Sequence, residues 1–600
     1  MRKLQELITE EVRAAFEAAG FDPALGQVVL SNRPDLCEYQ CNGAMAGAKA
    51  LHRPPFEIAD AVAEKLSDSQ VFEKAESVKP GFLNLTLRPE YVRQYLVKML
   101  HEKKFGLEMP AHAPKIIIDY GGANVAKPLH VGHLRPAIIG ESLKRILRYA
   151  GNDVTGDIHM GDWGLQIGLV ITELKHRRPE LPWFDEAYSG AYPKEPPFTM
   201  EEFGEMYPTA SAKSKASETD SEEDKAAAAA YKAEAMEATK RLQDGDRAYR
   251  DLWKKIMAVS LPNLRKNYDS LHVTFDLWRG ESDVQELIPG MLDYFRQNGY
   301  AHESRGALVI DVAEESDTKE MPPCIVRKSD GASLYATTDL ATIQERMGEF
   351  RPDMMIYITD KRQALYFEQV FRAAKKSRLA LPETTLTFIG HGTMNGKDGH
   401  PFKTRDGGVM KLESLIGDTE REMTERIKAS DTDMSGEEAE KTAKQIALAA
   451  IKYGDLSNQP SKDYIFDLEK FTSFEGDTGP YILYTIVRIK SILKKYEEQG
   501  KSAKDALLAA PGTAAEKSLS LQLTRFADAV EGAARELAPN RICAYIYELA
   551  NTFNTFYHET KILAEPDDEK RQSYIALISM TRRLLETGID LLGFEAPDRM

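Results

Sequence analysis

The chain has 600 residues, a formal net charge of −16 at pH 7 and a hydrophobic share of 42%. This length exceeds a single-core domain and predicts roughly four domain-sized units. The acidic balance excludes a general nucleic-acid coat protein, which would be basic, but it leaves room for a local basic face. No apolar run is long enough to span a membrane and the acidic first helix does not fit a signal peptide, so we expect a cytoplasmic protein with no membrane partner.

The cysteines are too few and too scattered for a disulfide framework or a four-cysteine zinc site. They are Cys37, Cys41, Cys324 and Cys543. No second pair completes a metal shell around the first two, so we expect buried free thiols and no structural metal.

Residues 1–108 mix helical and extended patterns and predict a small α+β domain. An amphipathic helix begins the chain, residues 28–30 are extended, and a second helix lies near residues 44–51. Residues 82–87 alternate in the manner of a half-buried strand. The proline-containing segment 101–114 predicts a linker.

Residues 115–168 predict a βαβ unit. An apolar strand at residues 116–118 is followed by a glycine turn, and apolar residues then recur at helical spacing until Gly151. An extended pattern resumes at residues 154–159.

Two histidines stand where this helix begins, in the order His130, Val131, Gly132, His133. A helix start has unpaired backbone N–H groups and the positive end of the helix dipole, so it attracts phosphate. Two imidazoles there can hold a polyphosphate, and Gly132 lets the ligand approach the backbone closely. A lone histidine in such a place is more often a cap or a core residue, so the pattern alone leaves both interpretations open.

Residues 180–265 predict an insertion between the halves of the nucleotide-binding fold, without chemistry of its own. Within it, residues 209–240 have almost no large apolar side chains but many Ala, Glu and Lys. That composition is typical either of a solvated helix or of a partly disordered segment.

Five short β-type runs predict the second half of the sheet. They are residues 307–312, 324–326, 334–336, 354–358 and 385–389. From about Leu412 onward we find no convincing strand, and long helical patterns predict an all-helical carboxy-terminal domain.

The histidine signature and its flanking residues resemble a known family. His-x-Gly-His between a strand and a helix is similar to the signature of the class I aminoacyl-tRNA synthetases and related nucleotidylyltransferases. NVAKP at residues 124–128 and GDWGLQ at residues 161–166 look like arginyl-tRNA synthetases of the bacterial type. The resemblance spans nearly the whole chain, including SNRPDLCEYQCN at residues 31–42 and the final LLGFEAPDRM.

This resemblance implies an α/β, Rossmann-like class I catalytic core at residues 109–410. It also implies an α+β domain at residues 1–108 that binds the tRNA elbow and a helical anticodon-binding domain at residues 411–600. The implied reaction is ligation of L-arginine to tRNA(Arg) through arginyl-adenylate, with ATP as substrate and Mg²⁺ neutralising its phosphates. We expect a monomer, because the sequence shows neither a coiled coil nor a dimerisation stripe.

A glycine-rich loop at residues 396–408 is a second predicted phosphate-binding segment. Glycines flank Lys403 and Arg405, so the loop can close on phosphates, although basic loops are more often simply exposed. It resembles the family's lysine-serine loop but lacks the usual second lysine, and the resemblance implies that Lys127 compensates. The predicted catalytic residues are His130, His133, Lys127 and Lys403, and Gly132 and Arg405 join them at ATP.

Two segments where a strand gives way to a helix carry the predicted arginine site. Tyr335 and Asp339 lie near the carboxyl end of a strand, where open α/β sheets bind ligands. A carboxylate there pairs with the planar guanidinium, whereas a helix N-cap is an equal alternative for Asp339. The resemblance implies that Tyr335, Asp339 and Gln363 bind arginine, and we expect Asn124 near its ammonium group.

The resemblance also implies tRNA contacts at both ends of the chain. The candidates for the tRNA elbow are Tyr39, Gln40 and Asn42, although a polar surface turn explains them as well. The candidates for the anticodon are Tyr481, Tyr484, Tyr557 and Met600, although aromatic residues at helical spacing more often form a core.

Two other functions fit parts of the sequence. Another adenylate-forming or nucleotidylyl-transferring enzyme could share the histidine signature, but the long helical region after Leu412 argues against it. An inactive paralogue that binds tRNA or senses arginine is disfavoured by the intact set of predicted site residues. Pyrophosphate exchange and tRNA charging with each amino acid separate these hypotheses.

Overall fold

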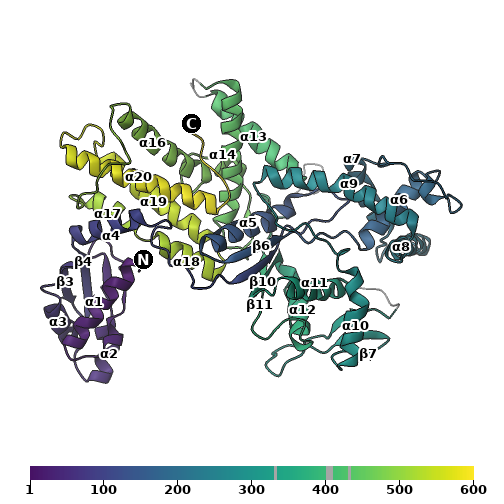
Figure 1. Cartoon of the computed structure of the whole chain (residues 1–600), viewed down its shortest axis with the longest axis horizontal. Coiled ribbons are helices and arrows are strands. Elements are labelled where there is room, and N and C mark those ends of the chain that lie inside the picture. Colours follow the sequence, from purple (N-terminus) through teal and green to yellow (C-terminus); the bar gives the residue numbers. More distant parts are fainter. Residues whose placement is uncertain (330–333, 401–409, 430–433) are drawn as a thin grey trace. The chain divides into compact units, whose positions relative to one another are not determined.

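A computed structural model describes residues 1–329, 334–400, 410–429 and 434–600 (Figure 1). These residues form two compact units. The first contains Met1–Pro110, Ser473–Leu591 and Glu595–Met600, and the second contains Ala111–Thr472 and Leu592–Phe594. None of the described helices is both long and apolar enough to cross a membrane.

The first unit combines an α+β region from the amino terminus with helices from the carboxy terminus. Its four-stranded antiparallel sheet has the order β1-β2-β4-β3. The predicted first helix, second helix and both strands are confirmed. The elements are α1 (Leu4–Ala18), η1 (Pro23–Gly26), β1 (Val28–Leu30), β2 (Tyr39–Cys41), α2 (Gly43–Leu51), α3 (Pro55–Lys65), β3 (Phe72–Val78), β4 (Phe82–Leu87), α4 (Pro89–His101), α16 (Gly479–Glu497), α17 (Ala514–Leu523), α18 (Phe526–Glu536), α19 (Asn540–Glu559) and α20 (Asp568–Leu591).

The second unit is built on a parallel sheet with the order β11-β10-β5-β6. Its strands are β5 (Lys115–Asp119), β6 (Asp153–Asp157), β10 (Met354–Asp360) and β11 (Thr385–His391). Each strand ends in a polar residue, and the carboxyl ends of parallel strands meet at one edge. Asp119, Asp157, Asp360 and His391 therefore mark that edge.

The predicted βαβ unit is confirmed. α5 (Leu134–Tyr149) connects β5 to β6, and its Gly140 faces the ring of Tyr120, where a Cβ would lie only 2.2 Å from a ring carbon. Gly121 and Gly122 follow the strand with φ angles of +95° and +62°, a turn that glycine adopts without strain. The histidine signature thus enters a helix that lies directly against the sheet.

Four helices follow β6 and pack against one another (Figure 1). They are α6 (Leu165–Arg177), α7 (Met200–Lys213), α8 (Glu222–Gln243) and α9 (Arg247–Ser270), with the short η3 (Pro182–Phe184) between α6 and α7. We call η3, α7, α8 and α9 the inserted segment. α8 buries mainly alanines and Tyr231, so residues 209–240 are largely helical and their low apolar content reflects a close-packed alanine face.

Two of the predicted sheet strands are placed differently. β8 (Ala307–Ile310) is the central strand of a separate antiparallel sheet, where it pairs with β7 (His302–Ser304) on one side and β9 (Cys324–Arg327) on the other. The assignment of β8 and β9 to the main sheet is therefore wrong. A short apolar run indicates a strand but not its partner. η4 (Gln285–Leu287) and α10 (Ile288–Gln297) precede this sheet.

The predicted extended run at residues 334–336 is also wrong, because α11 (Tyr335–Glu349) begins there. The Leu334 N–H donates to the Thr337 hydroxyl oxygen at 2.9 Å, and that hydroxyl donates to the Val326 carbonyl at 2.8 Å. Thr337 therefore both starts the helix and ties it to β9.

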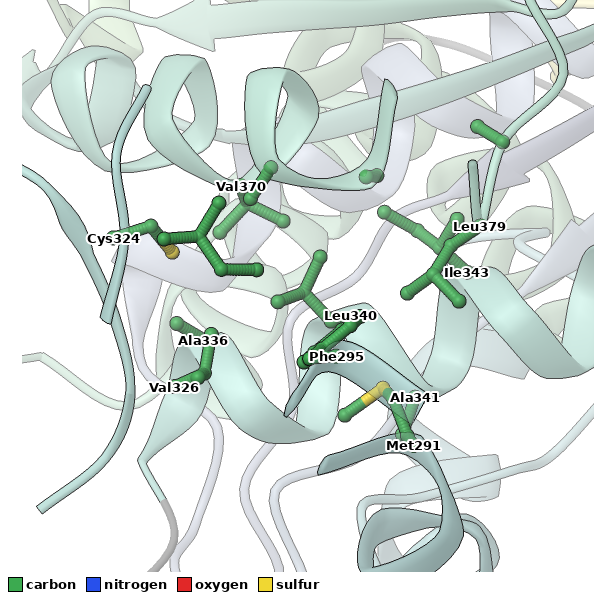
Figure 2. Packing of buried hydrophobic residues seen from close by; sticks show 14 of the residues in the cluster. Met291, Phe295, Cys324, Val326, Ala336, Leu340, Ala341, Ile343, Val370 and Leu379 are labelled. Atoms are coloured by element: carbon green, nitrogen blue, oxygen red, sulfur yellow. The ribbon is translucent and has the colours of Figure 1, made fainter. Parts of the chain in front are cut away.

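The buried face of α11 packs into a hydrophobic core, shown in Figure 2. Leu340 and Ile343 of this helix are fully buried, and Phe295 of α10 and Val370 of α12 (Ala364–Lys376) lie in the same cluster. A helix held this tightly gives its polar residues, such as Asp339, a fixed position.

The rest of the second unit is mainly helical. The elements are η2 (Val131–His133), η5 (Lys361–Gln363), β12 (Met394–Asn395), α13 (Leu412–Ala429), α14 (Gly436–Leu456), β13 (Tyr464–Ile465) and α15 (Leu468–Phe471). β13 corrects the expectation of no strand after Leu412, although it has only two residues and pairs with β12. The unit continues to Thr472, beyond the predicted boundary at residue 410.

A buried arginine joins two strand ends to α11. One terminal nitrogen of Arg346 donates to Asp119 and to Asp157, in both cases at 2.7 Å. The side chains of Arg346 and Asp157 are each 1% exposed. Removal of the guanidinium would leave two neighbouring carboxylates without their partner.

We predict that Arg346→Ala lowers the free energy of unfolding by about 3–5 kcal/mol, because an uncompensated buried charge is costly. Arg362→Ala is the matched control, since Arg362 pairs with Asp360 at 2.7 Å but is 80% exposed, and such pairs contribute about 1 kcal/mol or less. Urea denaturation of both variants measures the difference. Equal small losses would contradict the role given to Arg346.

Candidate active site

The two signature histidines lie together at the start of α5. Their ring centroids are 4.0 Å apart, and His133 is buried while His130 is half-buried. The Gly132 N–H donates to His130 Nδ1 at 3.0 Å, and the His130 N–H donates to His133 Nδ1 at 3.1 Å. Backbone groups of the signature therefore fix the orientation of both rings.

This arrangement determines which ring nitrogen of each histidine carries the proton. A neutral imidazole whose Nδ1 accepts a hydrogen bond carries its proton on Nε2. The approach of His133 Nδ1 to the His130 carbonyl would need the other tautomer, but at 3.3 Å it is the longer contact. Burial, followed by the charge of Lys127, lowers the pKa of His130 to about 4. Burial, followed by His130, lowers the pKa of His133 to about 3, so both rings are neutral at pH 7 and offer Nε2–H donors.

Residues that follow the second predicted phosphate loop are bonded to the segment that carries the histidines. The Val131 N–H donates to the Met410 carbonyl and the Leu412 N–H donates to the Leu129 carbonyl, both at 3.0 Å. Lys403 and Arg405 themselves lie outside the described residues. Residue 410, which follows their loop, is therefore hydrogen-bonded to the signature.

Lys127 lies close to the signature. It is half-buried, and its charge acts on the pKa of both histidines. Burial and then the charge of Lys215 lower the pKa of Lys127 itself. The structure therefore brings three of the four predicted catalytic residues together.

Asp339 lies on the second turn of α11 and is not the helix cap, because the helix begins at Tyr335 after Leu334. The hydroxyl of Tyr366 donates to the Asp339 carboxylate. Burial raises the pKa of Asp339 despite this bond. Asp339 is thus oriented by a neighbour and lacks a charged partner strong enough to keep its pKa low.

A second carboxyl, Glu281, lies near Asp339 and was not predicted. Burial raises its pKa to about 8, and the negative charges of Asp339 and Asp162 add to the effect. Glu281 stands in the loop between α9 and η4, where its N–H donates to the Met160 carbonyl at 3.0 Å. No periodic pattern marks this position, so only the fold reveals it.

The remaining predicted arginine ligands, Tyr335, Gln363 and Asn124, have no hydrogen bond to Asp339 or Glu281 among the described residues. Tyr335 is one helical turn from Asp339 and 66% exposed. Gln363 is exposed beyond the end of β10 and donates to the Thr359 hydroxyl at 3.0 Å. Asn124 is half-buried against Gly161, where a Cβ would lie 2.1 Å from its amide oxygen. Their contacts with arginine stay predictions.

Comparisons with known proteins find the same protein family for all parts of the chain that match. Family models match at residues 95–468 (tRNA synthetases class I (R), catalytic domain), 482–600 (DALR anticodon binding domain) and 2–87 (arginyl tRNA synthetase N terminal domain). An arginine–tRNA ligase of Agathobacter rectalis is 55% identical and one of Alkaliphilus oremlandii is 51% identical, each with full coverage of both chains.

The chain belongs to the arginine–tRNA ligase family. A crystal structure of the arginyl-tRNA synthetase from Plasmodium falciparum has the same fold, with a TM-score of 0.78, 22% identity and full coverage of both chains. The predicted fold class, a class I catalytic core with an α+β amino-terminal domain and a helical carboxy-terminal domain, is confirmed.

One of the tRNA-elbow candidates of this ligase-family chain needs correction. Tyr39 is only 3% exposed, and burial raises the pKa of its hydroxyl to about 12. A ring buried in the first unit is not presented to RNA, so Tyr39 is a core residue of β2. Gln40 is half-buried and donates to Asn84 at 2.9 Å, whereas Asn42 is exposed.

The anticodon candidates include an aromatic cluster in the first unit. The Arg488 guanidinium lies 4.8 Å from the ring centroid of Tyr484 and 4.9 Å from that of Tyr557. Tyr481 donates to Asn551 at 2.6 Å, and Tyr484 is 42% exposed. Arg488 was missed in the sequence because an isolated arginine on a helix carries no pattern. Met600, at the end of the chain, is partly exposed.

We predict that both signature histidines stay neutral down to about pH 5 and carry their proton on Nε2. Nitrogen NMR of histidine-labelled protein, assigned with His130→Asn and His133→Asn, measures protonation and tautomer together. In the unfolded chain both rings titrate near pH 6.5, so the native state binds fewer protons between about pH 3 and 6.5. The histidines therefore contribute stability above this range that is lost as the pH falls through it. Titration of either ring near 6.5 in the folded protein would contradict the prediction.

Proposed function

We propose that this chain ligates L-arginine to tRNA(Arg) in two steps at the site around α5 and α11. In the first, the arginine carboxylate attacks the α-phosphorus of ATP, a new P–O bond forms, and pyrophosphate leaves. In the second, a hydroxyl of the terminal adenosine of the tRNA takes the arginyl group and AMP leaves. No side-chain nucleophile is required, so the protein acts by positioning and by electrostatic stabilisation.

The pair of Asp339 and Glu281 is the observation that carries the choice of arginine. Two carboxyls with raised pKa values lie close enough to repel each other. A guanidinium removes this repulsion because it is always charged and bonds carboxylates through a planar fork. Tyr366 orients Asp339 for that contact through its hydroxyl. Tyr335 is close enough to Glu281 and Asp339 for their charges to raise its pKa, after burial. Tyr335 and Gln363 would contact arginine, and Asn124 would contact the substrate ammonium.

The triphosphate would lie against the opposite side of the site. Neutral His130 and His133 would donate through Nε2 to phosphate oxygens, with Gly132 leaving room for the ligand. Lys127, Lys403 and Arg405 would supply positive charge as pyrophosphate leaves. These roles are supported by the hydrogen bonds that join residues 129–131 to residues 410–412.

Mg²⁺ would enter with ATP. Among the described residues no group of three His, Cys, Asp or Glu side chains is arranged to hold a metal ion. The residues nearest the phosphates are neutral or positive, so phosphate oxygens and water are the ligands that fit Mg²⁺ here. When bound, the ion would neutralise phosphate charge.

Binding of tRNA would use surfaces of the first unit. The helical region holds the Tyr484–Arg488–Tyr557 cluster, where an arginine between two rings offers stacking surfaces for bases. Asn42 and Gln40 are the remaining candidates for the tRNA elbow. We expect the chain to act as a monomer in the cytoplasm.

Charging of tRNA(Arg) with each amino acid tests the proposal, and we predict that only arginine is attached.

Asp339→Asn should lower kcat/KM for arginine about 100-fold or more, because the guanidinium loses a partly buried ionic partner, while ATP binding is retained. Asp293→Asn on α10, 66% exposed, is the matched control. Failure to charge arginine would refute the function, and undiminished charging by Asp339→Asn would refute the role of Asp339.

The raised pKa of Glu281 predicts a pH-dependent affinity for arginine. Below about pH 8 the carboxyl of the empty site binds a proton, which the guanidinium must displace. The Kd for arginine should therefore fall as the pH rises from 6 to 8, by up to about tenfold per unit. Calorimetry in two buffers would detect the released proton. Glu281→Gln removes the titrating group, so this variant should bind arginine weakly, with a Kd that does not change with pH. If its Kd depends on pH as steeply as that of the unmodified chain, Glu281 is excluded as the cause.

A further inference from the structure

The segment that carries Lys127 is held by the inserted segment. Ala126 has a φ of +59°, which is strained for a residue with a Cβ. Its N–H donates to the Ser260 hydroxyl of α9 at 2.9 Å, and Ser260 is 1% exposed. This hydrogen bond from Ala126 to α9 therefore stabilises a backbone conformation that alanine rarely adopts.

A second inserted helix reaches the side chain of Lys127. The ammonium nitrogen lies 5.1 Å from the ring centroid of Tyr207 on α7. A Cβ on Gly204, one turn earlier, would be 3.6 Å from Pro128, so α7 runs directly beside residues 127 and 128. Tyr207 itself is anchored, since it packs with Leu165 against a small core formed by α6, α7 and α8.

The kind of contact matters for phosphate binding. Within the described part of the chain Lys127 forms no salt bridge with a carboxylate, and the charge that lowers its pKa is that of Lys215, a cation. A carboxylate would fix the lysine but cancel its charge and compete with ATP. The negative face of an aromatic ring attracts an ammonium group without neutralising it. Lys127 is thus fixed while its charge stays available to a polyanion.

We propose that the inserted segment is part of the ATP site, with Tyr207 and Ser260 as positioning residues for Lys127. Ser260 fixes the backbone just before the lysine, and the ring of Tyr207 fixes the ammonium group where the triphosphate binds. The proposal departs from the expectation that the insertion has no chemistry of its own. The inference rests on the proposed function, because it assumes that Lys127 binds ATP during arginine charging.

The experiment compares variants that remove or keep the aromatic ring at position 207 and measures the KM for ATP. Tyr207→Leu should raise the KM for ATP in tRNA(Arg) charging by about three- to thirty-fold, the range expected from one cation–π contact, with a smaller change in kcat. Tyr207→Phe keeps the ring and should behave like the unmodified chain. Tyr192→Leu is the matched control, because Tyr192 lies in the same insertion with Arg247 at 4.7 Å from its ring but without contact to Lys127.

Coupling to the lysine is tested in a Lys127→Met background. There, Tyr207→Leu should add no further rise in the KM for ATP, and Ser260→Ala should likewise lose most of its effect. The proposal is overturned if Tyr207→Phe is as impaired as Tyr207→Leu, if Tyr207→Leu matches Tyr192→Leu, or if its effect persists in full without Lys127.

A measurement on the unmodified sequence keeps the proposal testable if Tyr207→Leu does not fold. Lysines labelled with ¹³C-methyl groups report nearby rings by NMR, and loss of one signal in Lys127→Arg assigns Lys127. Its methyl signal should be shifted upfield by the Tyr207 ring and should move on addition of ATP. An unshifted signal overturns the proposal. If the unmodified chain fails to charge arginine, the proposed function falls instead.

Discussion

The ion pairs of Arg346 are the constraint on which the catalytic unit depends. One buried guanidinium nitrogen binds the last residues of β5 and β6, and the side chain belongs to α11. The sheet edge and the helix that carries Asp339 are therefore fixed to each other by the same group. Parallel strands that end in carboxylates would otherwise repel one another at the place where the ligand binds. A cation built into the scaffold offsets part of the negative charge of the structural carboxylates, Asp119 and Asp157, and Asp339 and Glu281 are the carboxyls that the proposed function assigns to a substrate.

The two sides of the site differ in their electrostatics. Around α5 the groups are neutral histidines and a lysine, and around α11 they are carboxyls whose pKa values are raised. A molecule that is positive at one end and reacts at a carboxylate at the other fits between them only in one orientation. Neutral histidines suit the phosphate side because they donate hydrogen bonds without first having to lose or gain a proton. In the proposed function, this charge distribution would orient both substrates before any bond changes.

Local patterns in the sequence predicted the parts that depend on near neighbours. The βαβ unit and the position of His130 and His133 followed from strand and helix periodicity with glycine turns. Partners far apart in the chain were not predictable, so β8 and β9 were assigned to the wrong sheet and Glu281 was missed. Burial was also invisible at Tyr39, since a tyrosine in a polar segment looks the same whether its ring points inward or outward. The roles of Asp339, Gln363 and Lys127 came from family resemblance, because no spacing rule distinguishes them from ordinary helix residues.

The hydrogen bonds between residues 129–131 and 410–412 also bear on biosynthesis. The two partners are separated by nearly three hundred residues, so the histidine signature leaves the ribosome long before the segment that completes its surroundings. At ~5–20 residues per second this delay is roughly 15 to 55 s. The sheet cannot be completed for most of that time, since β10 and β11 also follow late in the chain. In a nascent chain of this architecture, β5 and β6 are therefore exposed until the later strands are synthesised. Chaperone binding would protect these strands from aggregation during this interval.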